Sequence, residues 1–198
     1  MRRLASAVRA LSIAGAGLLA PVAFACGFED PAAMQTGFLN WEYPNALYVD
    51  TAVWRAQLDG RIETDPPLQT TNLLLVNPGF RKAMKTLEDF TVHLAGDPDP
   101  QHAQSFVVLF MEAMLWSRFE IGDGDAKLYP HIKAAADGET VVITHRVVLE
   151  AINRGALSAE EARRLGLMRL YGDDAAIAKT MAVFKLRMGA NQLGSAAP

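Results

Sequence analysis

The chain has 198 residues, with 22 acidic and 19 basic side chains, a formal net charge of −3 and one cysteine. This balance does not favour a nucleic-acid partner, because binding to a phosphate backbone needs a surplus of positive charge. The single cysteine excludes a disulfide within the chain. The length suits one domain that buries a substantial core.

The first 25 residues have the pattern of a secretory signal peptide. Arginines supply its positive start, 11–24 is apolar and too short to cross a membrane comfortably, and Ala23-Phe24-Ala25 is an A-x-A cleavage site. Its removal would leave 16 basic and 22 acidic residues, a net charge of −6. We therefore expect a periplasmic protein with one domain over 26–188, in which 26–44 is an N-terminal arm, and a tail over 189–198.

Cys26 would be the first residue after cleavage. In a bacterial lipoprotein this cysteine carries the lipid, but Ala23 stands where the lipid signal usually has leucine, and Phe24 is bulky for the next site. The pattern favours an unmodified cysteine and a soluble periplasmic protein. Lipidation of Cys26 and anchoring to the membrane stay open as the alternative. A metal site that joins the thiolate to Glu29 or Asp30 is a weaker one.

Two helices are predicted in the N-terminal half. Apolar residues recur at helical spacing over 45–58, although a short strand over 47–49 competes with the start of this helix. The second helix runs over 78–95 and begins at a proline. Before them, Trp41 and Tyr43 favour a loop that Trp41 holds against the core. The alternative is an aromatic rim around a ligand site.

The middle of the chain predicts three strands. The run 105–111 is apolar throughout and 115–121 alternates, which indicates one strand buried on both faces and one half-exposed strand. Glu112-Ala113 would separate them, with one continuous helix as the alternative. We expect a turn over 122–125, in preference to a calcium loop, because too few oxygen ligands stand at the required spacing. A third short strand is expected over 126–132.

The C-terminal part has the clearest boundaries. It predicts, in order, a strand over 140–144, a helix that ends at Gly155, a short helix, a strand over 167–171 and a last helix from Asp173 to Arg187. Ser158 and Glu161 form a capping box at the start of the short helix, and Gly166 ends it. Together the elements predict a single α+β domain in which helices pack on a mixed or antiparallel sheet.

Three quoted segments carry a resemblance to a known family. They are the strand Val141-Val142-Ile143-Thr144, the turn Arg154-Gly155-Ala156-Leu157-Ser158-Ala159, and Gly166-Leu167-Met168-Arg169-Leu170-Tyr171-Gly172-Asp173. This order resembles the C-terminal half of a sterol-carrier-protein-2 (SCP2-like) domain over 140–188, roughly a quarter of the chain. Ala159 stands where that family often has proline. The resemblance implies a hydrophobic cavity for lipids and no catalytic residue.

The resemblance places this cavity between the sheet and the last helix. The apolar side chains predicted to line it are Phe106, Leu109, Leu115, Phe119, Met168, Leu170, Ile177, Met181 and Phe184.

Motifs for catalysis or metal binding are not found in the sequence. His93, His102, His131 and His145 lack the spacing of metal ligands, and no nucleophile elbow, P-loop or dinucleotide motif occurs. Glu112 is the best candidate for an acid with a raised pKa, because it stands in an apolar stretch. The favoured interpretation is still a turn residue that reaches solvent. We expect no cofactor.

Three functions remain open. The first is a non-catalytic binding protein for a lipid or another hydrophobic ligand. The second is an accessory or protein-interaction module of the cell envelope that has no ligand. The third is an enzyme or a metal- or thiol-dependent role of Cys26. An apolar cavity would separate the first from the second, and converging polar side chains would favour the third.

Overall fold

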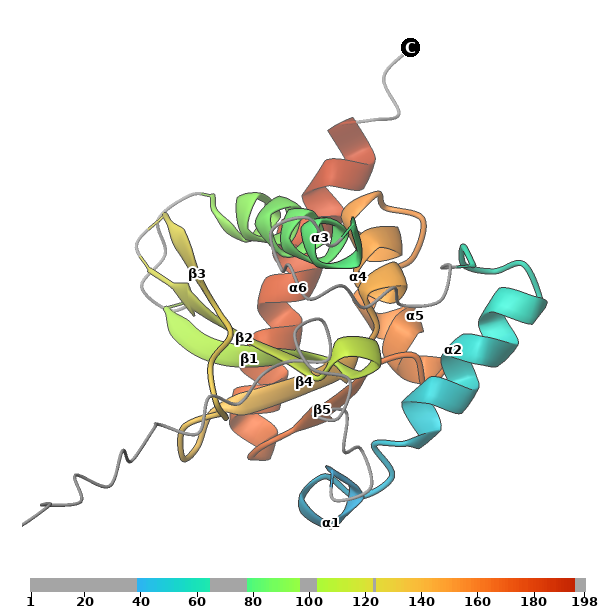
Figure 1. Ribbon diagram of the computed structural model, residues 1–198. Helices are drawn as coiled ribbons and strands as arrows, with labels where there is room; N and C mark the ends of the chain where they lie inside the picture. Colours follow the sequence, from blue (N-terminus) through green and yellow to red (C-terminus); the bar gives the residue numbers. More distant parts are fainter. Residues whose placement is uncertain (1–38, 65–77, 97–102, 123, 195–198) are drawn as a thin grey trace, which may run out of the picture.

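A mixed five-stranded sheet is the centre of the computed structural model, which describes residues 39–64, 78–96, 103–122 and 124–194 (Figure 1). The strand order is β3-β2-β1-β4-β5. The strands are β1 (Gln104–Phe110), β2 (Leu115–Ile121), β3 (Ala126–Pro130), β4 (Thr140–Thr144) and β5 (Arg169–Tyr171). The first four confirm the predicted strands. The predicted α+β class is also confirmed.

The two central strands are the most apolar ones. β1 pairs with β4 in parallel, with Val108 opposite Val142, and the other pairings are antiparallel. The predicted break after β1 is a 3₁₀ turn over Met111–Ala113, followed by Met114 in the left-handed conformation with φ 47°. This turn lets the chain reverse, so β2 runs antiparallel to β1. The continuous helix is excluded.

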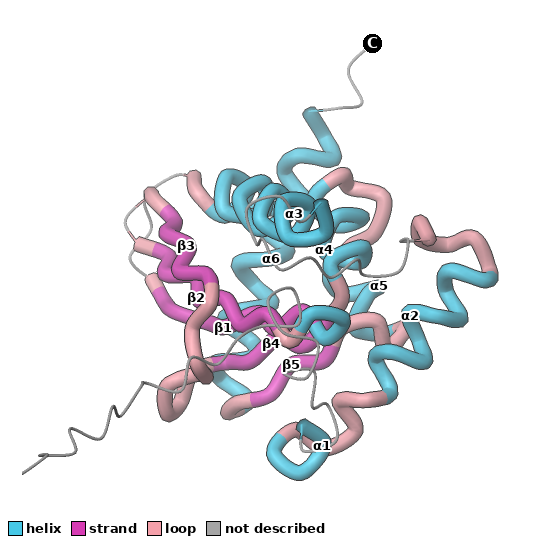
Figure 2. The backbone as a smooth tube through the Cα atoms, in the orientation of Figure 1, coloured by secondary structure: helices cyan, strands magenta, loops and turns pink. Residues whose placement is uncertain are grey.

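Six helices in the described part surround the sheet (Figure 2). They are α1 (Leu39–Glu42), α2 (Tyr48–Leu58), α3 (Pro78–Leu94), α4 (Arg146–Asn153), α5 (Ala159–Arg164) and α6 (Asp174–Gly194). The predicted helix 78–95 is confirmed. α2 begins three residues later than predicted, because Asn45 has φ 67° and the chain turns there before the helix starts. The strand alternative over 47–49 is wrong.

Local signals fix the boundaries of the C-terminal elements. Gly155 has φ 69° after α4, and Gly166 has φ 75° after α5, as glycines at helix ends often do. The Ser158 hydroxyl accepts the N–H of Glu161 at 3.1 Å, which is one half of the predicted capping box. The Glu161 carboxylate instead pairs with Arg164 at 3.2 Å.

Two predicted ends in this part are wrong. β5 begins at Arg169 and not at 167, because the Leu167 N–H still bonds to the Ala162 carbonyl and its own carbonyl accepts the Thr144 hydroxyl. The last helix runs on to Gly194.

Several predictions lie outside the described residues. These are the signal peptide, the arm up to residue 38, Cys26 with Glu29 and Asp30, His102, and the tail beyond 194. Within the described ranges, no helix has both the length and the apolar character needed to cross a membrane.

Candidate functional site

Three of the predicted lining side chains meet in an aromatic cluster between the sheet and two helices. Phe106 of β1 and Phe119 of β2 are stacked with ring centroids 5.3 Å apart. Phe184 of α6 meets the ring of Phe106 at 5.3 Å, and Phe90 of α3 meets Phe119 at 5.3 Å and Phe184 at 5.4 Å. All four are almost fully buried. The rings contact one another in the edge-to-face and stacked geometries that aromatic cores prefer.

The remaining predicted lining side chains divide between two faces of the sheet. Leu115 lies on the same face as Phe119, four residues earlier on β2, whereas Leu109 lies on the opposite face from Phe106, three residues away on β1. The Leu109 side chain therefore points away from the aromatic cluster, and its role in ligand binding stays a prediction. β1 is buried on both faces, so its composition did not reveal which face each residue occupies.

The others differ in their burial. Met168 is buried just before β5, whereas Leu170 on β5 and Met181 on α6 are partly buried against the core, and Ile177 is also half-buried. Their role in ligand binding stays a prediction.

The two residues of the predicted aromatic rim have opposite environments. Tyr43 is 7% exposed, and its ring lies 6.0 Å from that of Trp116 and 5.2 Å from that of Tyr171. Its hydroxyl donates to Glu42 at 3.0 Å, and burial, followed by this bond, raises the pKa of Tyr43. Trp41 is 87% exposed. The prediction that Trp41 holds the segment against the core is wrong, because Tyr43 does so.

Other large apolar side chains are exposed on α2, the next helix after Trp41 in the chain. Among the described residues, seven such side chains are exposed, and four of them belong to α1 and α2: Trp41, Tyr48, Trp54 and Leu58. On α2 the buried residues Val49 and Val53 face the core, so Trp54 and Leu58, one turn apart, lie on the outer side. We call these four residues the outer aromatic surface.

A polar cluster joins α2, the 3₁₀ turn and the start of α4. His145 Nε2 lies 2.5 Å from Asp50 Oδ1, and His145 Nδ1 lies 3.4 Å from Glu112 Oε2. The other Glu112 oxygen accepts the backbone N–H of Arg146 at 2.7 Å. This N–H is the first of α4, so Glu112 caps the positive end of a helix that its own preceding residue does not cap.

Glu112 is the predicted acid with a raised pKa. Its side chain is only 20% exposed, so the favoured interpretation of a turn residue that reaches solvent is wrong. Burial raises the pKa of Glu112, while His145 and the Arg146 N–H favour the ionised form and oppose that effect. The sequence signal was the apolar stretch around Glu112. Asp50 and His145 carried no signal, because they become neighbours only in the folded chain.

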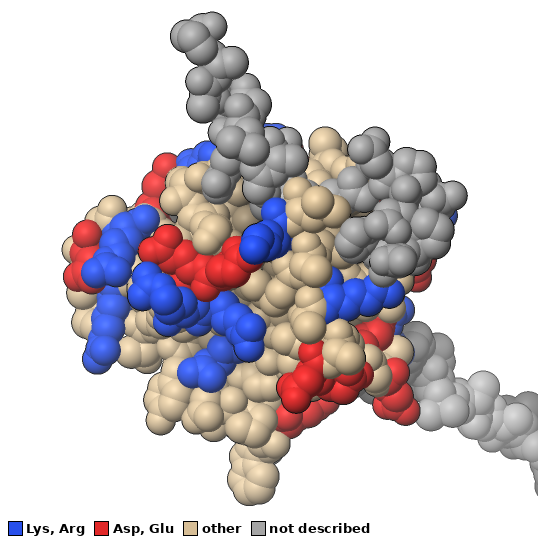
Figure 3. All heavy atoms as spheres, turned by 180° about the vertical axis from the view of Figure 1, so that it is seen from behind, with Lys and Arg blue, Asp and Glu red and all other residues tan. Residues whose placement is uncertain are grey.

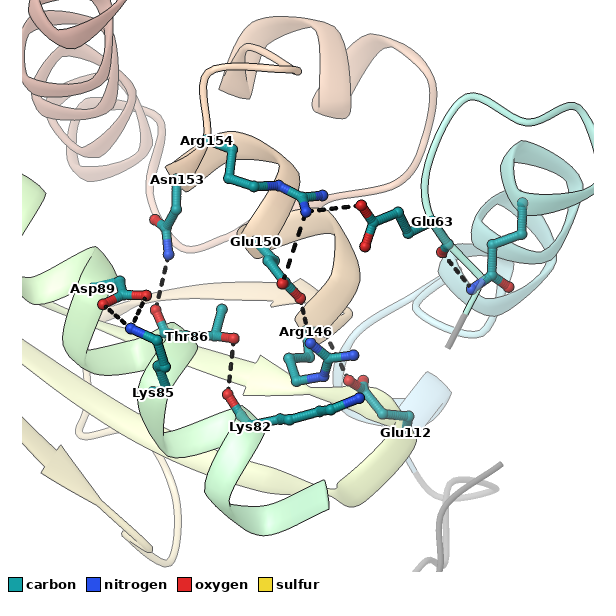
Figure 4. A network of polar contacts seen from close by, with 11 residues as sticks. Glu63, Lys82, Lys85, Thr86, Asp89, Glu112, Arg146, Glu150, Asn153 and Arg154 are labelled. Carbon is teal, nitrogen blue, oxygen red and sulfur yellow. Dashed lines mark hydrogen bonds and ion pairs between the residues drawn. The ribbon is translucent and has the colours of Figure 1, made fainter. Parts of the chain in front are cut away.

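A charged cleft lies beside this cluster, between α3 and α4 (Figure 4). It has a volume of about 180 Å³ and is lined by Glu63, Thr64, Lys82, Lys85, Thr86, Asp89, Arg146, Val147 and Glu150. The Arg146 side chain is 7% exposed, and its guanidinium pairs with Glu150. Lys85 pairs with Asp89 at 2.9 Å.

Three cations balance three anions in the lining of this cleft, and most of them already form ion pairs with one another. The cleft is therefore polar, unlike the apolar cavity that the resemblance implies. Figure 3 shows the face of the molecule opposite to that in Figure 1, where basic and acidic side chains lie next to one another in mixed groups with uncharged surface around them.

Metal binding has no support in the described part of the chain. No three side chains of His, Cys, Asp or Glu there converge on one point. His145 faces its two carboxylates through opposite sides of the ring, which leaves no shared point for an ion.

Comparisons with known proteins give likenesses in structure. No protein-family model matches, and no curated protein matches. Similar solved structures include a sterol carrier protein 2 like 2 from Aedes aegypti, with 18% identity, a TM-score of 0.43, and coverage of 52% of this chain and 96% of that one. Another is a UbiJ-SCP2 ubiquinone synthesis protein, with 18% identity, a TM-score of 0.32, and coverage of 58% of this chain and 84% of that one.

A third structure is the stereoselective inverting sec-alkylsulfatase Pisa1 from Pseudomonas sp. Here the identity is 14%, the TM-score is 0.37, and the match covers 47% of this chain but only 14% of that one. The SCP2-like resemblance seen in the sequence thus recurs among solved structures.

Proposed function

We propose that the protein is a non-catalytic binding protein for a lipid or another hydrophobic ligand. The observation that carries this proposal is the outer aromatic surface on α1 and α2, where four large apolar side chains are between 59% and 87% exposed. Contiguous exposed apolar surface often marks an interaction site, and Trp54 and Leu58 lie one turn apart on the same side of α2. Tryptophan and tyrosine contribute strongly at such sites, because they combine an apolar ring with a polar atom. The SCP2-like names among the similar structures are in line with such a ligand.

The test is to remove apolar surface from α2. Trp54→Ser and Leu58→Ser should each weaken the uptake of a fluorescent fatty acid by about tenfold, because burial of a large apolar side chain contributes about 1.5–3 kcal/mol. Val92→Ser on α3 is a matched control, since Val92 is 72% exposed and Leu58 is 67% exposed. Unchanged uptake in both α2 variants, or an equal loss in the control, would refute this site.

A second candidate function is an accessory or interaction module of the envelope that binds another protein. It is favoured by the aromatic cluster, which occupies the place where the resemblance implies a cavity. Native mass spectrometry of protein purified from the periplasm, followed by solvent extraction, separates the two candidates. A bound lipid supports the first, and a protein partner without lipid supports the second.

The cavity of the resemblance has its own test in Met181→Trp. A tryptophan that fills a cavity between the sheet and α6 should abolish fatty-acid uptake with little change in stability. In a closed core it should instead lower the free energy of unfolding by about 1–3 kcal/mol.

The proposed location is the periplasm, with cleavage before an unmodified Cys26. This rests on the A-x-A site and on the residues before it. The intact mass of the mature protein tests it, because a diacylglyceryl group adds a defined mass and indicates a membrane-anchored lipoprotein. A thiol or metal role of Cys26 would show as loss of function in Cys26→Ser.

A further inference from the structure

One imidazole lies between two carboxylates that come from distant parts of the chain. His145 is 95 residues from Asp50 in sequence, and it stands directly before α4, while Glu112 belongs to the 3₁₀ turn. α2 is thus connected through His145 to the start of α4 and, through Glu112, to the end of β1. We call these three residues the α2 junction.

The hydrogen-bond chemistry of the junction requires a proton between Glu112 and His145. An ionised carboxylate only accepts hydrogen bonds, so Nε2 must carry a hydrogen to bond to Asp50. A neutral imidazole then presents a lone pair at Nδ1, and this lone pair faces Glu112 Oε2 at 3.4 Å. Two acceptors would repel each other there, whereas one shared proton makes the contact attractive.

The surroundings of the carboxyl favour this protonated form. Glu112 Oε2 is buried and has no well-aligned hydrogen-bond partner, although the 3.4 Å separation is close enough for an ion pair. Burial raises the pKa of Glu112, so the folded protein holds the proton to a higher pH than the unfolded chain does. In the described part of the chain, charged side chains near the junction also include Arg146 and Glu150 of α4, which pair with each other, and Lys82 of α3, which extends toward Glu112 in Figure 4.

We propose that the α2 junction is a proton-dependent fastening, in which a proton shared by Glu112 and His145 holds α2 against the start of α4 and its loss loosens α2. When the shared proton is present, the imidazole of His145 carries partial positive charge, and it donates a charge-assisted hydrogen bond to Asp50. Without it, the imidazole is neutral, the bond to Asp50 loses that assistance, and Nδ1 meets an ionised Glu112. The stability of the junction is therefore present at low pH and is lost as pH rises through the titration of the pair.

α2 also carries Tyr48, Trp54 and Leu58 of the outer aromatic surface. Loosening α2 would change the geometry of that surface, so the junction would make hydrophobic binding depend on pH. This second step rests on the proposed function, whereas the fastening itself does not.

Hydrogen–deuterium exchange of the whole chain tests the fastening without any ligand. In the wild type, the amides of α2 should exchange about tenfold faster, after correction for the intrinsic pH effect, at about pH 8 than at about pH 5, the range in which histidines titrate. Glu112→Gln should abolish this difference, because an amide donates permanently to Nδ1 and still accepts from Arg146. Glu160→Gln, at an exposed site on α5, should leave it intact.

A second variant does not alter the buried carboxyl. Asp50→Asn acts on a side chain that is 47% exposed, and it should make α2 exchange as fast at low pH as the wild type does at high pH. The proposal is overturned if wild-type α2 exchanges equally at both pH values, or if Asp50→Asn keeps the full pH dependence.

A fluorescent fatty acid added at both pH values tests the second step. Weaker binding at high pH in the wild type but not in Glu112→Gln would support it. If α2 exchange depends on pH but no fatty acid binds at either pH, the fastening stands and the proposed function fails.

Discussion

Truncation of Phe106 distinguishes a filled core from a lipid cavity. Phe106 is 0% exposed, and its ring lies within 6.5 Å of the rings of Phe90, Phe119 and Phe184. Phe106→Ala removes most of a buried side chain, which costs about 3–5 kcal/mol in a close-packed core, and the three ring contacts place it near the upper end, at about 4 kcal/mol. Next to a cavity that a lipid fills, the loss without lipid would be smaller, because fewer atoms contact the ring.

The assay is urea unfolding followed by tryptophan fluorescence and circular dichroism, with the slope of the transition unchanged. A loss of about 4 kcal/mol is a large part of the stability of most domains, so Phe106→Ala could leave the chain unfolded. Phe106→Leu is therefore measured as well, with an expected loss of about 1 kcal/mol in the free energy of unfolding. Leu170→Ala is the control at a half-buried predicted lining residue, where about 1–2 kcal/mol is expected. If Phe106→Ala costs less than about 2 kcal/mol, the aromatic cluster is not a filled core, and the cavity prediction gains support.

Three further predictions concern the sheet and its connections. Glu139 accepts two hydrogen bonds from Arg118, at 2.8 and 2.9 Å. Burial alone would raise the pKa of Glu139, but the hydrogen bonds to its carboxylate, first those from Arg118, outweigh burial and lower the pKa. The stabilisation by these bonds is therefore present at neutral pH and is lost as pH falls through the lowered pKa. Glu139→Gln should therefore lower the free energy of unfolding at neutral pH by about 2 kcal/mol and make that free energy decrease less steeply as the pH is lowered. Urea unfolding measured from neutral to acid pH tests this, and the same decrease of stability in acid as in the wild type would contradict it. Gly172→Ala should destabilise the protein by more than about 1 kcal/mol in thermal unfolding, because Gly172 has φ +142° and an added Cβ would lie 3.3 Å from the backbone of Thr140. A variant as stable as the wild type would show that the end of β5 adjusts freely. Ser158→Ala should lower the free energy of unfolding by about 1 kcal/mol, because it removes the hydroxyl that caps α5, whereas Ser158→Gly should lower it less. Equal decreases in the two variants would mean that the hydroxyl is not the stabilising group.

The boundaries of most elements could be predicted from the sequence because their causes are local. The apolar run of β1 and the alternation of β2 are patterns of adjacent residues. The glycines after α4 and α5 stand where the backbone has a positive φ, which other residues avoid. Gly155 and Gly166 therefore marked helix ends correctly. Asn45 shows the limit, since a single positive φ moved the start of α2 without a strong signal in composition.

The candidate site depends on contacts between distant residues, and the tertiary structure alone decided them. Glu112 was recognised as an unusual acid from its apolar neighbours, but its burial and its partner His145 follow from the way β1 and α4 meet. Trp41 and Tyr43 are both large aromatic residues and stand two residues apart. Only the position of the sheet decided which of the two side chains became buried. The sequence by itself determined where strands, turns and caps form, because these depend on a few adjacent residues. Packing decided which side chains face a core, a cleft or solvent, because burial depends on segments that the chain brings together only when it folds.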